Sequence, residues 1–163
     1  MNTVLEQRIE ILPEKRLIGK SMTMTFSANT THELWRSFIL RRKEVQHAVG
    51  FNLYSIQQYA PGFFAHINPD SSFKKWAAVE VSEVGAIPED MEEIHIEAGM
   101  YAVFDYKGDV SNAAHTFQYI LGVWLPQSIY VLDDRLHFEI LKEKYKNGDP
   151  DSEEEIWIPI RDK

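Results

Sequence analysis

The sequence predicts an α+β fold made of two βαββ modules, whose antiparallel sheets form a concave groove and whose helices lie outside. Two observations lead to this prediction. Extended and helical hydrophobic patterns follow one another in the same order in both halves of the chain, which indicates an internal duplication. The 163 residues suffice for one domain but would be cramped as two. We therefore expect one domain over residues 1–163, with modules at about 6–85 and 91–162.

The first module is expected to contain one helix among extended segments. Thr30 and Glu33 have the spacing of a capping box, which predicts a helix over about 31–48. Gly19 suggests a bulge or a bend in the first extended segment. Alternating apolar residues predict strands over residues 6–26, 51–59 and 76–84.

The second module repeats this order. Asp109 or Ser111 is expected to begin its helix, and Pro126 is expected to end it. The acidic run 149–155 predicts a solvated hairpin loop before the last strand. Strands are expected over residues 94–106, 136–145 and 154–160.

Charge and composition argue against several classes of partner. The net charge of −8 would repel a polyanion over most of the surface, so we expect no nucleic-acid partner. No apolar run approaches the roughly 18 residues of a membrane span, and no signal peptide is visible. We therefore expect no membrane association and a cytoplasmic location.

Motifs for cofactor chemistry are also missing from the sequence. The chain has no cysteine, which excludes a thiolate metal site and a cysteine nucleophile. It has no glycine-rich phosphate loop, no GxSxG motif and no histidine pair at metal-ligand spacing. We accordingly expect neither a cofactor nor a metal.

Glu139 is the candidate functional residue. Alternation along the strand 136–145 places Phe138 on an apolar face that should meet a helix, and Glu139 on the other face. His137 shares the face of Glu139. Because the open faces of two βαββ units can cover each other, this face is expected to look into the groove between them, where ligands often bind. A strand glutamate that points into water is the alternative interpretation.

Aromatic residues are expected to surround Glu139. A hairpin of the last two strands would place Trp157 beside it, and the alignment of the two halves places Tyr54 opposite it. Phe38 and Trp124 lie on helical apolar stripes, so they belong either to the pocket or to an ordinary core. A carboxylate among aromatic rings suits a flat, apolar and often cationic ligand.

Short motifs along nearly the whole chain carry a family resemblance. They are Gly99–Phe104 followed by Gly108, Trp124–Ser128, Phe138–Glu139 and Glu155–Ile160. In this order and spacing they resemble the GyrI-like domain, also called the AraC-type effector-binding domain. Ile129 stands where a glycine is more usual in that family, and Trp157 replaces a commoner tyrosine. These departures concern the shape of the pocket more than the fold.

The resemblance implies that Glu139 faces a hydrophobic ligand pocket and that the chain is similar to stand-alone members of the family. Three functions follow from it as alternatives. The first is binding of bulky apolar, aromatic or cationic xenobiotics. The second is hydrolysis of cyclopropane-bearing DNA-alkylating compounds, in which Glu139 would be catalytic and Tyr101 or Tyr54 would orient the substrate. The third is an inhibitory interaction with gyrase.

Overall fold

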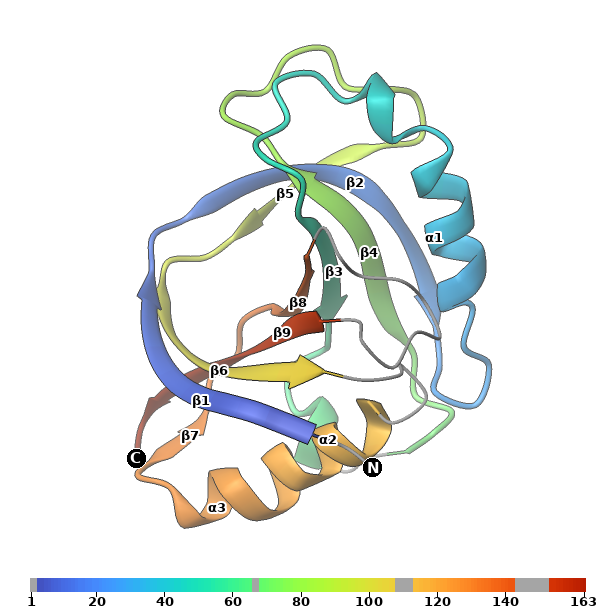
Figure 1. Cartoon of the computed structure of the whole chain (residues 1–163). Helices are drawn as coiled ribbons and strands as arrows, with labels where there is room; N and C mark the ends of the chain where they lie inside the picture. The colour runs from blue at the N-terminus through green and yellow to red at the C-terminus, as the bar shows by residue number, and fades with distance from the viewer. Residues whose placement is uncertain (1–2, 66–67, 108–112, 143–152) are drawn as a thin grey trace.

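A computed structural model describes residues 3–65, 68–107, 113–142 and 153–163 (Figure 1). The helical elements are α1 (Thr31–Ile39), α2 (Ala113–Tyr119), a π-helical turn (Ile120–Trp124), α3 (Leu125–Gln127) and two 3₁₀ turns (Arg42–Glu44 and Phe63–Ala65). The strands are β1 (Thr3–Leu12), β2 (Lys15–Met24), β3 (Leu53–Gln58), β4 (Phe73–Glu80), β5 (Glu92–Ile96), β6 (Gly99–Lys107), β7 (Tyr130–Leu132), β8 (His137–Leu141) and β9 (Glu153–Asp162). None of the helices in the described part of the chain has the length and apolar character needed to cross a membrane.

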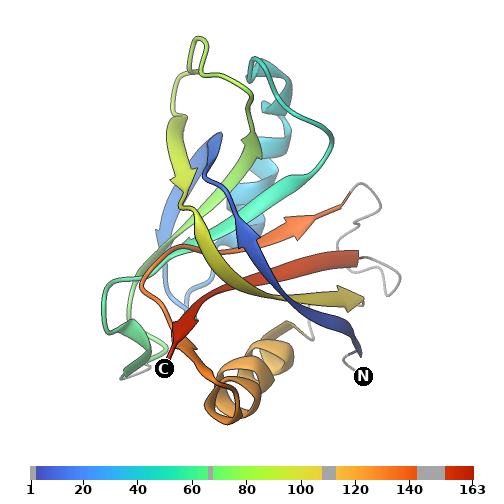
Figure 2. The same cartoon turned by 90° about the vertical axis from the view of Figure 1, so that its left-hand side faces the viewer.

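The described strands form one open, strongly curved antiparallel sheet, rather than the separate sheets expected for two modules (Figure 2). Its order is β1-β6-β9-β8-β3-β4-β2-β5, and β7 pairs with β9. The order is symmetric about its centre. Strands β1, β2, β3 and β4 of the first half occupy the same places, counted from one edge, as β5, β6, β8 and β9 of the second half, counted from the other edge. Strands β3 and β8 lie side by side in the middle, so each half contributes one central strand.

A long paired ribbon joins the two halves of the sheet. Strand β1 continues into β2 through Pro13 and Glu14, while β5 continues into β6 through Glu97 and Ala98. Strand β1 pairs with β6 and β2 pairs with β5, so the two bent strands run along each other over most of their length.

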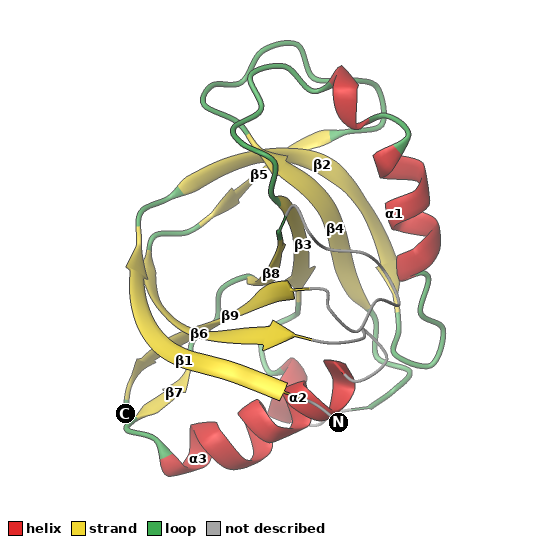
Figure 3. Ribbon diagram, in the orientation of Figure 1, coloured by secondary structure: helices red, strands yellow, loops and turns green. Residues whose placement is uncertain are grey.

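The helices cover two different parts of one face of the sheet (Figure 3). Helix α1 packs on β2 and β4 through Leu34 and Phe38, which are buried against residues such as Val79. The segment from α2 to α3 packs on β6 and β9 through Ile120 and Leu125. Strands β3 and β8 therefore run between the regions that the two helical segments cover.

The other face of the sheet carries no helix in the described structure and is buried by the curvature of the sheet itself. A third core cluster fills this space, and its large members are Tyr54, Trp76, Tyr101, Phe138 and Trp157. A strand buried in this way shows the same apolar alternation as one covered by a helix. This explains why the face of Phe138, which was expected to meet a helix, instead meets other strands.

Helix α1 differs from the sequence prediction at both ends. Thr30 makes no side-chain cap hydrogen bond, and the Thr31 amide instead donates to Asn29 Oδ1 at 2.9 Å. The helix ends at Ile39 rather than near residue 48. Beyond its end, the side chains of Arg41 and Arg42 donate to the backbone carbonyls of Glu89 and Phe51, which lie in neighbouring loops.

Another local prediction needs correction. Gly19 lies in an unbroken register between β2 and β4, so there is no bulge; a Cβ there would collide with the Ala77 carbonyl. Pro126 was expected to end the second helical segment, which ends one residue later, at Gln127. The predicted helix starts at Asp109 and Ser111 lie outside the described residues.

Candidate functional site

Glu139 lies in the middle of the helix-bearing face. In the sheet it stands across from Ser55 of β3 on one side and Ile156 of β9 on the other. Ile156 belongs to the core under α2 and α3, which identifies the face. Since β3 and β8 are the central strands, the carboxylate lies between the regions that the two helical segments cover. Glu139 as a whole is partly exposed.

A buried glutamine holds the Glu139 carboxylate. Gln57 Nε2 donates to Glu139 Oε1 at 3.3 Å and also lies 3.4 Å from Ser55 Oγ. Gln57 is only 5% exposed, and its Oε1 has no hydrogen-bond partner among the described residues. Burial raises the pKa of Glu139, while the charge of Lys75 and the Gln57 hydrogen bond oppose this rise. The described residues give Glu139 no salt bridge.

Lys75 is held at a distance from the acid by α1. It lies on β4 across from Gln57, and its Nζ donates to Thr31 Oγ1 of α1 at 3.1 Å. The lysine therefore bridges the sheet to the helix, and its charge reaches Glu139 without a direct ion pair. This leaves the carboxylate open to a further positive charge.

Glu154 of β9 is a second acid on this face, and it was not predicted from the sequence. It belongs to the acidic run that predicted a solvated loop, yet it is only 3% exposed. Burial raises the pKa of Glu154 to about 8, helped by the negative charge of Glu139 and opposed by Lys75. The signal available in the sequence was the alternation of β9, in which Glu154 shares a face with Ile156 and Ile158.

Aromatic rings line the face beside Glu139, at the start of β8. The Tyr59 ring meets the His137 ring edge-on at 5.0 Å, and the Phe64 ring lies 5.4 Å from it. Burial lowers the pKa of His137 to about 3, so its imidazole is neutral and acts as one more ring. Burial and the charge of Glu139 raise the pKa of Tyr59. A cavity of about 260 Å³ opens beside His137; it is lined by Tyr59, Phe63 and Phe64 and also by Asp133, Asp134 and Arg135, and its lining does not include Glu139.

Trp157 and Tyr54 do not stand beside Glu139, and the expectation that they do is wrong. Cross-strand partners share a face of a sheet. The register pairs Trp157 with Phe138, and Tyr54 with Ile140, so both aromatic rings lie on the face opposite to the acid. The Trp157 and Phe138 rings stack at 5.3 Å, and the Tyr54 hydroxyl donates to Glu80 Oε1 at 3.2 Å.

Tyr101 belongs to the same opposite-face cluster. Its ring lies 5.5 Å from Phe138 and 5.8 Å from Trp157, and its hydroxyl donates to the Glu97 carbonyl at 2.6 Å. The Arg135 guanidinium covers the ring at 4.6 Å. Tyr101 therefore has structural partners and does not reach the carboxylate of Glu139 on the other face.

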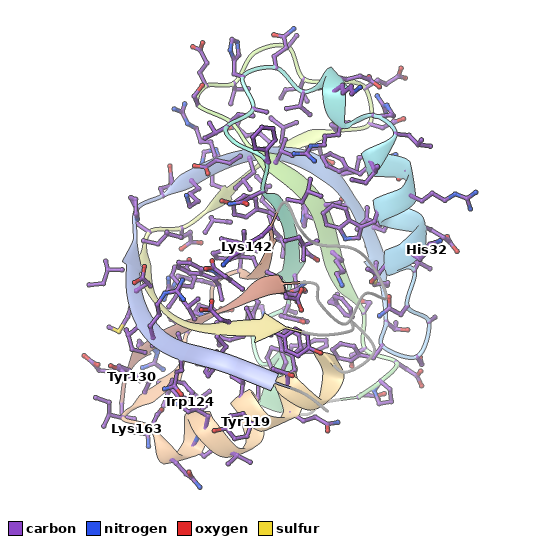
Figure 4. The ribbon with its side chains drawn as sticks, in the orientation of Figure 1. His32, Tyr119, Trp124, Tyr130, Lys142 and Lys163 are labelled. Carbon is purple, nitrogen blue, oxygen red and sulfur yellow. The ribbon has the colours of Figure 1, made fainter. Side chains whose placement is uncertain are left out.

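Phe38 and Trp124 lie on the helix-bearing side but within the two separate helix cores. Phe38 is fully buried under α1, with its ring 6.0 Å from Trp35. Trp124 meets Phe104 edge-on at 5.1 Å and stacks on Tyr130 at 6.4 Å (Figure 4). Among the residues that the structure describes, no group of three or more acidic or histidine side chains could hold a metal ion.

Comparisons with known proteins place this arrangement in a family. The family described as the GyrI-like small molecule binding domain matches residues 5–161, and the chain belongs to this family. The chain is 27% identical over 161 residues to the transcriptional regulator BrlR of Pseudomonas aeruginosa, covering 96% of this chain and 56% of the regulator. It therefore spans about half the length of that curated relative.

Solved structures share the fold. The structure of SAV2435 bound to tetraphenylphosphonium superposes with a TM-score of 0.71 at 16% identity, covering 96% of this chain and 94% of that one. A hydrolase from Listeria innocua superposes with a TM-score of 0.60 at 12% identity, covering 96% and 92%. At these identities the likeness concerns the fold alone.

Proposed function

We propose that this domain binds a bulky, apolar organic cation on the helix-bearing face, with Glu139 as its counter-charge. The observation that carries the proposal is a central carboxylate that one buried amide holds and that no described cation pairs directly. Burial disfavours its ionised form, so an incoming positive charge gains more from it than from a surface acid. The neighbour bound to tetraphenylphosphonium, an aromatic cation, supports this class of ligand.

The aromatic cavity beside His137 would receive the apolar part of such a ligand. His137 shares the face of Glu139, two positions along β8, and its ring contacts Tyr59 and Phe64. Rings attract cations through their faces and bury large apolar areas. The acid and the aromatic cavity together would favour a ligand that is both charged and bulky.

Titration calorimetry with two ions of equal shape tests the proposal. Tetraphenylphosphonium and tetraphenylborate differ in the sign of their charge, so we expect the protein to bind the first and reject the second. Glu139→Gln should weaken phosphonium binding at least about tenfold, because a buried charge partner is lost. Glu89→Gln makes the same charge change at an exposed position and should leave binding unchanged. Equal binding of both ions, or full binding by Glu139→Gln, would refute the proposal.

Binding is better supported than the two other functions. In the hydrolase hypothesis Tyr101 or Tyr54 orients the substrate beside Glu139, but both tyrosines lie on the opposite face of the sheet. The hydrolase from Listeria innocua resembles this chain in fold only. None of the proteins named above points to gyrase as a partner.

The symmetric strand order supports a further part of the proposal, namely that the fold consists of two duplicated βαββ modules. Exchanging the strands of one half with those of the other leaves the order of the sheet unchanged. Sequence profiles built separately from the two halves of related proteins should then match each other in register. Profiles that match no better than those of unrelated βαββ units would refute the duplication.

A further inference from the structure

Glu139 and Glu154 are diagonal neighbours on one face of the sheet. Across the β8–β9 ladder, Glu139 stands opposite Ile156 and Glu154 stands opposite Leu141, so the two acids are one diagonal step apart. Side chains at diagonal positions of an antiparallel pair are within reach of one another when they are long. The electrostatic effect of Glu139 on Glu154 agrees with this placement.

The Glu154 side chain is buried and incompletely bonded. It is 3% exposed, and its Oε2 has no hydrogen-bond partner among the described residues. An ionised carboxylate in such a position would be costly, because burial removes water from Oε2 without supplying a donor to this oxygen. The Glu154 carboxyl group should therefore be protonated unless a positively charged group binds beside it.

The charges around the pair do not balance when both acids are ionised. In the described structure the titratable groups that face the pair are Lys75 on β4, Tyr59 after β3, His137 on β8 and Tyr106 on β6. Of these, Lys75 acts on both acids as a positive charge, and His137 is held neutral by burial. Two carboxylates and one ammonium leave one negative charge, which a single retained proton removes.

We propose that Glu154 is a second recognition acid of this site, and that binding of one organic cation expels the proton that Glu139 and Glu154 share. The inference rests on the proposed function, since it takes the cation to bind at Glu139. It adds a second acid and a proton exchange that balances the charge of a singly and permanently charged cation, such as a quaternary phosphonium or ammonium.

The exchange keeps charge and atoms balanced. In the free protein the Glu139–Glu154 pair holds one proton, the other carboxylate of the pair is ionised and Lys75 is charged, so the cluster is neutral. When the cation enters, the O–H bond of the protonated acid breaks, its electron pair stays on the carboxylate, and the proton passes to the buffer. One positive charge enters the cluster and one leaves it.

Calorimetry of the intact chain with tetraphenylphosphonium tests the exchange, because the charge of this probe cannot titrate. Titrations at pH 7 in two buffers of different ionisation enthalpy report the protons released. We expect about one proton per bound cation, and an affinity that rises up to about tenfold per pH unit from pH 6 and levels off above pH 8. Equal heats in both buffers with flat affinity would overturn the inference.

Variants separate this inference from the proposed function. Glu154→Gln should still bind the cation but release no proton, and its affinity should be flat between pH 6 and 8. Glu89→Gln, as the matched control, should keep the proton release of the wild type. If the wild type binds no phosphonium at any pH, the proposed function fails; if it binds without releasing a proton, only the present inference fails. If Glu154→Gln does not fold, the titrations of the wild type in two buffers still show whether binding releases a proton.

Discussion

Trp157 stacks on Phe138, the residue immediately before Glu139, and therefore faces away from the acid. The two rings lie 5.3 Å apart with their planes 15° from parallel. Side chains alternate between the faces of a strand, so this stack and the Glu139 carboxylate lie on opposite sides of the same sheet. Trp157 thus belongs to the aromatic core of one face, and Glu139 is presented on the other.

Replacing Trp157 should affect stability rather than binding. Its residue is 5% exposed inside a packed aromatic cluster, so Trp157→Leu should lower the free energy of unfolding by about 2–4 kcal/mol. Urea denaturation measures this loss. Folded Trp157→Leu protein should bind tetraphenylphosphonium as the wild type does. A folded variant that has lost phosphonium binding would contradict the placement of Trp157.

A substitution at Gly99 should be costly, because this residue stands at the bend between β5 and β6 with a φ of +154°. Side chains rarely adopt this backbone conformation, and an added Cβ would collide with the Arg135 guanidinium. Gly99→Ala should therefore destabilise the protein by about 1–3 kcal/mol in chemical denaturation. Gly122→Ala is the matched control: an added Cβ there meets nothing within 4 Å, so that variant should be neutral or slightly more stable. Equal effects of the two substitutions would refute the argument.

Gln57 should control the acidity of Glu139. The Nε2 donor of Gln57 favours the ionised carboxylate, and Gln57→Leu removes it, so the pKa of Glu139 should rise further. Carbon NMR titration of the labelled carboxyl measures the shift. Gln58→Leu is the control, because Gln58 bonds Trp76 on the opposite face and should leave the Glu139 titration unchanged. An unshifted midpoint in Gln57→Leu would mean that the hydrogen bond does not stabilise the carboxylate.

His137 should make the protein sensitive to acid. Its pKa is lowered to about 3 in the folded protein, from an ordinary value of 6.5, so the unfolded chain binds more protons between these values. The stability of the wild type should accordingly fall as pH decreases from about 6.5, by up to about 1.4 kcal/mol per pH unit from this group. His137→Phe keeps a ring beside Tyr59 and should lose this contribution in urea denaturation between pH 7.5 and 4.5. If the stability of His137→Phe follows that of the wild type at every pH, His137 is not a buried neutral histidine. His32→Gln is the control, because His32 is exposed and its loss should leave the pH dependence of stability unchanged.

Alternation along single strands could be predicted from the sequence, and the relation between strands could not. The period of two predicts that His137 shares the face of Glu139, and the structure agrees. The partner of Glu139 on β9 depends on the register of the β8–β9 pair, and a shift of one residue exchanges every facing side chain. The predicted neighbour was Trp157, and the observed one is Ile156.

The sequence pattern also could not predict how the helix-free face is buried. Apolar alternation indicates that a face is covered, but not whether a helix or another part of the same sheet covers it. Glu154 escaped prediction for a related reason. Its acidic neighbours in the sequence suggested water, whereas its position in β9 places it in the protein interior.

The ribbon that joins β1–β2 to β5–β6 ties the folding of the N-terminal half to residues that follow it much later in the chain. Such distant pairings form slowly, because a large loop must close before they contribute any free energy. A fragment that ended before Met91 would leave β1 and one edge of β2 without partners, and unpaired edges recruit other chains. The intact protein is therefore expected to fold slowly as one cooperative unit, and its N-terminal half alone to aggregate.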